Sequence, residues 1–164
     1  MGAREKLTNE LNELLNQPYL QELFSVDYWD PDNPDIFHWQ ATIKGPEGTP
    51  YEGGKFKLEI ICKESYPKMG PYIHFITKIY HCNFNVYNGD ICLNVLDYWN
   101  KDTMNIRKAL EAILVLFINP GIDDPIDYGD LYKNNRDQFN KNAREWTAKY
   151  ANENDFDKPE KQVL

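Results

Sequence analysis

The chain of 164 residues lacks the long apolar runs and the basic excess that mark many membrane proteins and nucleic-acid-binding proteins. Its longest apolar run, residues 112–118, is far shorter than the roughly 20 residues of a membrane-spanning helix. Residues 1–6 show no apolar stretch of a signal peptide. The 18 basic and 26 acidic residues give a net charge of −8, which argues against nucleic acid and anionic membranes as partners. This charge suits a protein that meets other proteins, although solvation alone also explains it.

Cysteine is also scarce, and Cys62, Cys82 and Cys92 are the only three. An odd number, without a Cys-x-x-Cys pair or a Cys/His cluster at zinc spacing, predicts neither a disulfide scaffold nor a metal site. Reduced thiols in the cytoplasm or the nucleus are therefore expected. Cys62 ends an alternating segment and is predicted to pack in a core. By spacing alone, either Cys82 or Cys92 is a candidate nucleophile, and a purely structural role for all three remains open.

Hydrophobic periodicity predicts one α+β domain over residues 1–151, followed by a short charged tail over residues 152–164. Apolar residues recur at helical spacing from Leu7 to Leu15 and predict a first helix that Pro18 stops. Further helical patterns end at Asn119-Pro120-Gly121 and at Tyr150. Alternating segments predict four strands of an antiparallel meander, near residues 24–28, 37–43, 56–60 and 73–75.

Residues 79–100, between the last strand and the next helix, follow neither period. They are polar and aromatic, and Asn88-Gly89 is a signal for a tight turn. A long irregular stretch inside a compact domain is usually functional. We therefore expect the active site in this segment, which contains both Cys82 and Cys92.

Six short fragments follow one another along the chain: residues 39–46, 49–54, 66–67, 80–83, 89–93 and 123–125. In their order and spacing they resemble the ubiquitin-conjugating enzyme family, and the resemblance covers roughly residues 3–151. Each fragment is weak alone, whereas six in sequence are specific. The resemblance implies a UBC-like fold: an N-terminal helix, a four-stranded meander, an irregular active-site segment and C-terminal helices. Residues 142–151 are similar to the last helix of the ubiquitin-type members.

This resemblance implies a transferase that works as an acyl carrier. An activating enzyme, which uses the ATP, passes the C-terminal glycine of the modifier to Cys92 as a thioester, and a substrate lysine or a ligase cysteine then takes it over. The chain itself is expected to need no cofactor and no metal. The implied partners are ubiquitin or a ubiquitin-like protein, the activating enzyme, a RING or HECT ligase and protein substrates.

The sequence around Cys92 agrees with a carrier. Asp90 and Asp97 are its charged neighbours, and the nearest basic side chain in sequence is Lys101. An unperturbed cysteine is only a few per cent thiolate at pH 7. Nothing local activates the thiol, which suits a carrier that receives an activated acyl group better than it suits a cysteine protease.

Residues 80–83, inside the irregular segment, carry further implied roles. Asn83 matches the asparagine of the family motif His-Pro-Asn, which implies a hydrogen-bond donor to the oxyanion formed when lysine attacks. The alternative is that Asn83 holds its own loop through side chain–backbone bonds, and both roles can coexist. Tyr80 and His81 are expected to be structural, with a buried, hydrogen-bonded imidazole. Cys82 replaces the usual proline, which predicts a somewhat looser loop.

Asp124 matches the acidic residue that positions the incoming lysine and assists its deprotonation in many members. A free lysine has a pKa near ~10.4 and attacks only after losing its proton. The alternative is that Asp123 or Asp124 caps a helix starting near Pro125. Asn94 stands where many ubiquitin-type members carry aspartate and some members for other modifiers carry asparagine. A different ubiquitin-like modifier therefore remains an alternative.

The resemblance also implies contacts with partners. Arg4 and Lys6 match basic residues of the first helix that meet the activating enzyme and the ligase. Lys68 replaces the phenylalanine of members that work with many ligases, and residues 100–103 after Trp99 also differ from those members. Because loss of an apolar anchor weakens an interface, we expect a narrower or different set of ligases. Glu111 stands at an apolar position of members that fold the donor ubiquitin back, which weakens the expectation of that arrangement.

Two other functions compete with this one. A non-catalytic binding module of the same fold lacks the cysteine, whereas Cys92 is present. A thiol hydrolase needs a Cys/His/Asp arrangement. The chain has only His38, His74 and His81, of which the first two stand at polar strand positions, so we disfavour a hydrolase.

Overall fold

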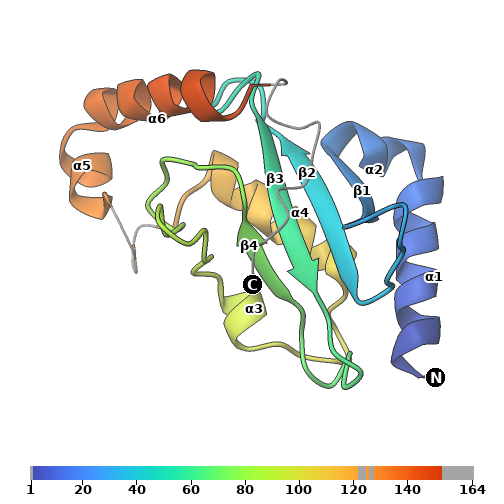
Figure 1. The fold of residues 1–164 in the computed structure, drawn as a ribbon. Coiled ribbons are helices and arrows are strands. Elements are labelled where there is room, and N and C mark those ends of the chain that lie inside the picture. The colour runs from blue at the N-terminus through green and yellow to red at the C-terminus, as the bar shows by residue number, and fades with distance from the viewer. Residues whose placement is uncertain (1, 122–124, 126–127, 153–164) are drawn as a thin grey trace.

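The structure is a computed structural model that describes residues 2–121, 125 and 128–152 (Figure 1). Helices and strands follow the predicted order, with two unpredicted short helices added. The elements are α1 (Ala3–Asn16), α2 (Pro18–Leu23), β1 (Phe24–Tyr28), β2 (His38–Lys44), β3 (Lys55–Ile61), β4 (Tyr72–Phe75), α3 (Asn94–Asp97), α4 (Ile106–Ile118), α5 (Gly129–Asn134) and α6 (Arg136–Tyr150).

The four strands form one sheet in the order β1-β2-β3-β4, and each pair is antiparallel. This confirms the predicted meander. Alternating residues of each strand point to the same face, and the register places buried Leu58 of β3 opposite Phe75 of β4 and Ala41 of β2. The apolar sets of neighbouring strands therefore coincide on one face of the sheet.

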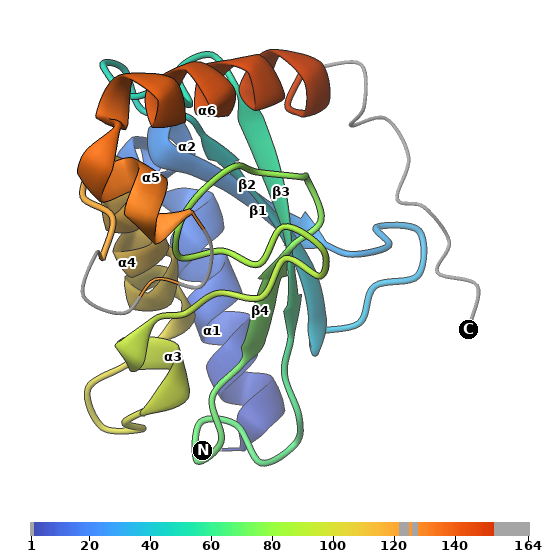
Figure 2. The ribbon, with the colours of Figure 1, turned by 90° about the vertical axis from the view of Figure 1, so that its left-hand side faces the viewer.

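Helices α1 and α4 lie on the same side of the sheet, as Figure 2 shows. Their apolar stripes meet the sheet: Phe117 of α4 lies with its ring centre 5.3 Å from that of Phe56 in β3. Both rings are buried. Burying such a side chain contributes about 1.5–3 kcal/mol relative to leaving it exposed.

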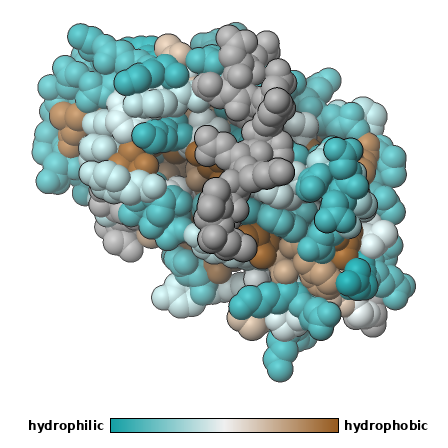
Figure 3. Space-filling view, viewed as in Figure 1, coloured by the Kyte–Doolittle hydropathy of each residue, from teal (hydrophilic) through white to brown (hydrophobic). Residues whose placement is uncertain are grey.

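Outside its grey atoms, the face in Figure 3 is mainly hydrophilic, with brown residues in separate groups.

Two short helices, α2 and α3, were not predicted from the sequence, and a third, α5, begins later than predicted. The first predicted helix does end before Pro18, but this proline is then the first residue of α2, because the first turn of a helix needs no N–H from that position. Helix α3 interrupts the segment predicted to be irregular. The helix predicted near Pro125 begins only at Gly129, as α5.

No helix among the described residues is long and apolar enough to span a membrane. The boundary between a domain over residues 1–151 and a tail over residues 152–164 stays a prediction, because all of the tail except Asn152 lies outside the described residues.

Candidate active site around Cys92

A short hairpin carries Cys92. The backbone N–H of Cys92 donates to the carbonyl of Asn83 at 2.9 Å, and Phe84 and Ile91 form an isolated antiparallel bridge. At the turn, the N–H of Gly89 donates to the carbonyl of Asn85 at 2.8 Å. Cys92 therefore sits directly beside the residue that the family resemblance pairs with it.

The turn of this hairpin is docked against β4. Phe75 donates its N–H to the carbonyl of Gly89 at 2.9 Å. Gly89 has φ +74°, and a Cβ there would lie 2.0 Å from the Phe75 carbonyl oxygen. Only glycine combines this backbone conformation with so close an approach. The turn signal in the sequence thus marks the point where the hairpin joins the sheet.

Cys92 is the only one of the three cysteines that is not buried, and it is half-buried. Burial, followed by the nearby charge of Glu10, raises the pKa of the Cys62 thiol to about 12. Burial likewise raises the pKa of Cys82, against smaller lowering effects from a backbone hydrogen bond, Arg136 and Lys133. Because the thiolate is the nucleophile, geometry favours Cys92 over the two buried thiols.

His81 is completely buried and uses both ring nitrogens. Nδ1 accepts the N–H of Asn83 at 3.0 Å, so Nε2 carries the proton and donates to the carbonyl of Leu116 at 2.7 Å. Burial lowers the pKa of His81 to about 4, although the bond to Leu116 acts in the opposite direction. The imidazole is therefore neutral and connects the hairpin to the C-terminal turn of α4.

The side chain of Asn83 is also committed to a structural contact. Its Nδ2 donates to the carbonyl of Gly121 at 2.7 Å, and its Oδ1 accepts the N–H of Gly121 at 2.8 Å. The asparagine therefore holds the segment that follows α4, rather than only its own loop. An amide has two N–H groups, so this pairing uses one of them. Asp123 and Asp124 lie just beyond Gly121, outside the described residues.

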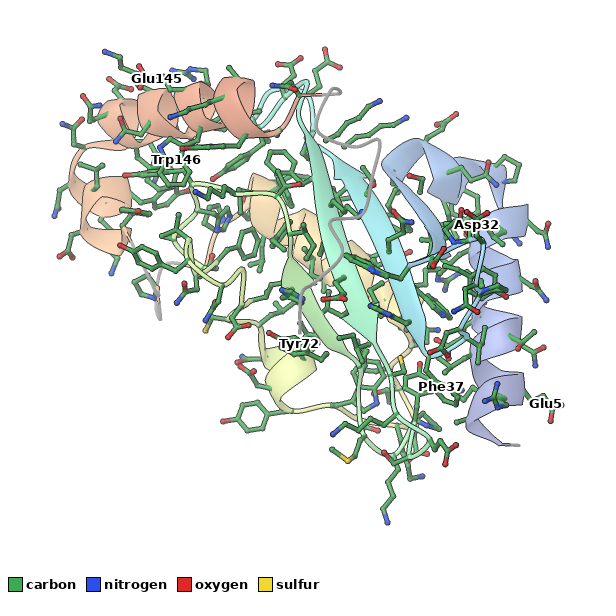
Figure 4. The ribbon with its side chains drawn as sticks, in the orientation of Figure 1. Glu5, Asp32, Phe37, Tyr72, Glu145 and Trp146 are labelled. Carbon is green, nitrogen blue, oxygen red and sulfur yellow. The ribbon has the colours of Figure 1, made fainter. Side chains whose placement is uncertain are left out.

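Contacts with other elements hold Tyr80 in place near the start of residues 79–100. Its ring stacks on Tyr128 with a centre distance of 4.0 Å and meets Trp146 of α6, which is labelled in Figure 4. The Tyr51 hydroxyl donates to the Tyr80 carbonyl at 2.6 Å, and Asn142 donates to the Tyr80 hydroxyl at 3.3 Å. Helix α6 and the loop before β3 thus hold the residue next to His81.

The two loops with predicted ligase contacts lie against each other. The Trp99 indole N–H donates to the Pro67 carbonyl at 2.9 Å. A Cβ at Gly70 would lie 2.6 Å from the Trp99 ring, so the indole packs tightly on that loop. Lys68 is exposed on the same loop. Trp99 therefore joins the loops rather than standing alone at the surface.

Arg4 and Lys6 both lie on α1, where Arg4 is exposed and Lys6 is half-buried. The Arg4 guanidinium lies 5.0 Å from the centre of the Phe37 ring. Glu111 lies on α4, and its carboxylate is 3.7 Å from Nε of Arg107. Arg107 in turn binds Glu13 of α1 at 2.8 Å. The charge of Glu111 is therefore engaged by a neighbouring cation.

Sequence reasoning missed Glu10, which joins three elements. This buried carboxylate accepts the Tyr66 hydroxyl at 2.7–2.8 Å and the N–H of Ile106, the first residue of α4, at 2.8 Å. A carboxylate at a helix N-terminus is favourable. The sequence did indicate that Glu10 is buried, because it stands between Leu7 and Leu14 on the apolar face of α1.

Comparison with known proteins agrees with this geometry. The sequence model of the family described as ubiquitin-conjugating enzyme matches residues 6–147. The probable ubiquitin-conjugating enzyme E2 31 of Arabidopsis thaliana is 41% identical over 153 residues, which are 92% of this chain and 94% of that protein.

Solved structures give the same result. A crystal structure of a candidate ubiquitin-conjugating enzyme from Plasmodium yoelii is 37% identical, with a TM-score of 0.79 over 90% of this chain and 94% of that one. The E2 domain of a Toxoplasma gondii ubiquitin-conjugating enzyme is 34% identical, with a TM-score of 0.78 over 90% of this chain and 98% of that one. The chain therefore belongs to the ubiquitin-conjugating enzyme family, a family of transferases, and has its fold.

Proposed function

We propose that this protein accepts ubiquitin as a thioester on Cys92 and transfers it to lysine residues of other proteins with the help of a ligase. The observation that carries the proposal is the position of Cys92, which stands at the family's cysteine position, beside Asn83. Its thiol is half-buried, whereas the thiols of Cys62 and Cys82 are buried. The names of the relatives support ubiquitin as the modifier. Asn94 keeps a ubiquitin-like modifier as the alternative.

The proposed reaction has two acyl transfers. The Cys92 thiolate attacks the thioester carbonyl on the activating enzyme, an S–C bond forms, and the enzyme's thiolate leaves. A neutral lysine amine then attacks the new carbonyl, and the Cys92 thiolate leaves as the amide forms and the amine loses a proton. Neither step changes an oxidation state, and ATP is used only upstream.

The neighbouring residues have proposed roles in the second transfer. Asn83 holds Gly121 in place with one amide N–H, and we assign the other to the oxyanion, where one such donor is worth about 10²–10³ in rate. We assign Asp124 to orienting the lysine, on the family resemblance alone. Arg4, Lys6, Lys68 and the loop at Trp99 are the proposed partner contacts, and the proposed compartments are the cytoplasm and the nucleus.

Charging tests this proposal. With ATP, an activating enzyme and ubiquitin, we expect an adduct that reducing agent cleaves. Cys92→Ser is expected to give an adduct that resists reductant but is cleaved by alkali, because a serine forms an oxygen ester. Cys62→Ser is the matched control and should charge like the unchanged protein. A reducible adduct that persists in Cys92→Ala contradicts the proposal, and charging with other modifiers but not ubiquitin selects the alternative.

A further inference from the structure

Three polar side chains form a row on the outer face of the sheet, one from each of three neighbouring strands. Glu59 of β3 is buried, although it lies on the face opposite the core. Its Oε2 lies 2.5 Å from Nε2 of His38 in β2, and its Oε1 lies 2.7 Å from Nε2 of His74 in β4. Because a carboxylate only accepts hydrogen bonds, both imidazoles donate to it from Nε2.

His74 also faces an acceptor with its second nitrogen. Its Nδ1 lies 3.3 Å from the carbonyl oxygen of Asn88, at the turn of the hairpin that carries Cys92. A neutral imidazole has one donor and one acceptor nitrogen, whereas the imidazolium has two donors. Both contacts of His74 are therefore hydrogen bonds only when the ring is protonated. In the neutral ring that donates to Glu59, a lone pair of Nδ1 faces the lone pairs of the Asn88 carbonyl.

A second side chain of β4 contacts the same turn. The Tyr72 ring stacks on His74 with a centre distance of 5.0 Å, and its hydroxyl donates to Asp90 Oδ1 at 2.5 Å. Figure 4 shows Tyr72 at the start of β4, beside α3. Burial, then the hydrogen bond to Asp90, raises the pKa of Tyr72 to about 12, so the hydroxyl keeps its proton. Asp90 is two residues before Cys92.

These contacts hold the hairpin at its turn, while Cys92 stands at its end. We propose that Glu59, His74 and Tyr72 are positioning residues for Cys92, and that His74 fulfils this role completely only when it is protonated. The inference rests on the proposed function, in which Cys92 carries the modifier. Glu59 orients the imidazole, the imidazole holds Asn88, and the hairpin transmits this position to the nucleophile.

Other titratable groups lie near Glu59 and His74. His38 stacks on Trp29 and shares Glu59 with His74. Lys57 of β3 lies 4.6 Å from the Trp29 ring, and burial lowers its pKa while the charge of Glu59 raises it. Among the described contacts, none joins His38 to the hairpin. His38 is therefore the matched control, because it binds the same carboxylate without contacting the turn.

The test measures discharge of the charged protein onto free lysine across pH 6–9, in the unchanged protein, His74→Gln and His38→Gln. At each pH, the rate of the unchanged protein is divided by the rate of the variant. This ratio cancels the ionisation of the attacking lysine, which is common to all three proteins. We expect His74→Gln to discharge about fivefold more slowly at the acidic end, since one hydrogen bond is lost. This ratio should approach one as the pH rises, and His38→Gln should stay near one throughout.

Tyr72→Phe keeps the stacked ring but removes the donor to Asp90, so it should slow discharge by a factor that does not change with pH. Nitrogen NMR of the unchanged protein provides a measurement that needs no variant. The His74 ring should show two protonated nitrogens over the pH range in which the His74→Gln ratio exceeds one.

A ratio for His74→Gln that is independent of pH overturns this inference, as does a neutral His74 ring at the acidic end. If the unchanged protein forms no adduct on Cys92, the proposed function fails instead. A normal adduct with a flat ratio therefore rejects the positioning role alone.

Discussion

The sheet with α1 and α4 differs from residues 79–100 in what fixes its shape. The first region is held by apolar side chains that repeat with the period of their element, and Phe56 and Phe117 are typical. The second also buries a few apolar side chains, such as Phe84, but individual hydrogen bonds fix its shape, such as those of His81 to Asn83 and to Leu116. Many similar contacts stabilise the core, whereas a few unlike contacts position the nucleophile. Changes in the two regions should therefore affect different measurements.

A cavity in the core should have the largest effect. Phe56→Ala removes a buried ring that meets Tyr51 and Phe117, so the free energy of unfolding should fall by about 3–5 kcal/mol. Urea denaturation measures this change. Tyr19→Ala, at an exposed ring on α2, should change it by less than about 0.5 kcal/mol. Discharge per folded molecule should stay unchanged, and a selective loss of discharge would show that the two regions are not separable.

Acid should weaken the contact between the two regions. The pKa of His81 is about 4 in the folded protein and near ~6.5 in an unfolded chain. The unfolded chain therefore binds the proton first, and stability is lost as the pH falls from 6.5 towards 4. The loss from this group is roughly 3 kcal/mol. Urea denaturation across this range should show a weaker pH dependence for His81→Gln than for the unchanged protein. Equal slopes would mean that the imidazole is not buried in its neutral form.

A change in the second region should affect chemistry more than folding. Asn83→Ala should charge normally but discharge onto lysine about 10²-fold more slowly. Asn83→Asp keeps an acceptor for the Gly121 N–H but loses the donor. If the donor acts on the oxyanion, Asn83→Asp should also be slow. Recovery of the rate in this variant would assign Asn83 to holding Gly121 alone.

The smallest effect is expected at the surface. Lys68→Phe restores the apolar residue of members that use many ligases, on a loop that Trp99 already holds in place. Discharge stimulated by such a ligase should rise a few fold, because a buried aromatic anchor strengthens an interface. The melting temperature should not change. Lys63→Phe, at another exposed lysine, is the control, and equal stimulation by both variants would remove the specific role of the Lys68 position.

The sequence predicted the core better than the active site, for a physical reason. Periodicity reports burial, and it located all four strands as well as α1, α4 and α6. It does not report a hydrogen bond between distant residues, such as Glu10 with Ile106 or Asn83 with Gly121. Helices α3 and α5 have four and six residues, too few to show a period.

Within the active-site segment, the resemblance named Cys92, Asn83 and His81, and the structure places Cys92 beside Asn83 and His81 against Asn83. No sequence pattern predicted the contact between Asn88 and His74, because His74 was recognised only as a polar residue on a strand. Asp124 remains a prediction, since it lies outside the described residues.

The central claim is that Cys92 carries the modifier, and a protein that keeps this single cysteine tests it most directly. Cys62→Ala and Cys82→Ala together leave Cys92 as the only thiol. After incubation with ATP, an activating enzyme and ubiquitin, intact mass spectrometry should show one ubiquitin on this protein, removed by reductant. Absence of the adduct there, with a reducible adduct on Cys92→Ala, would contradict the account.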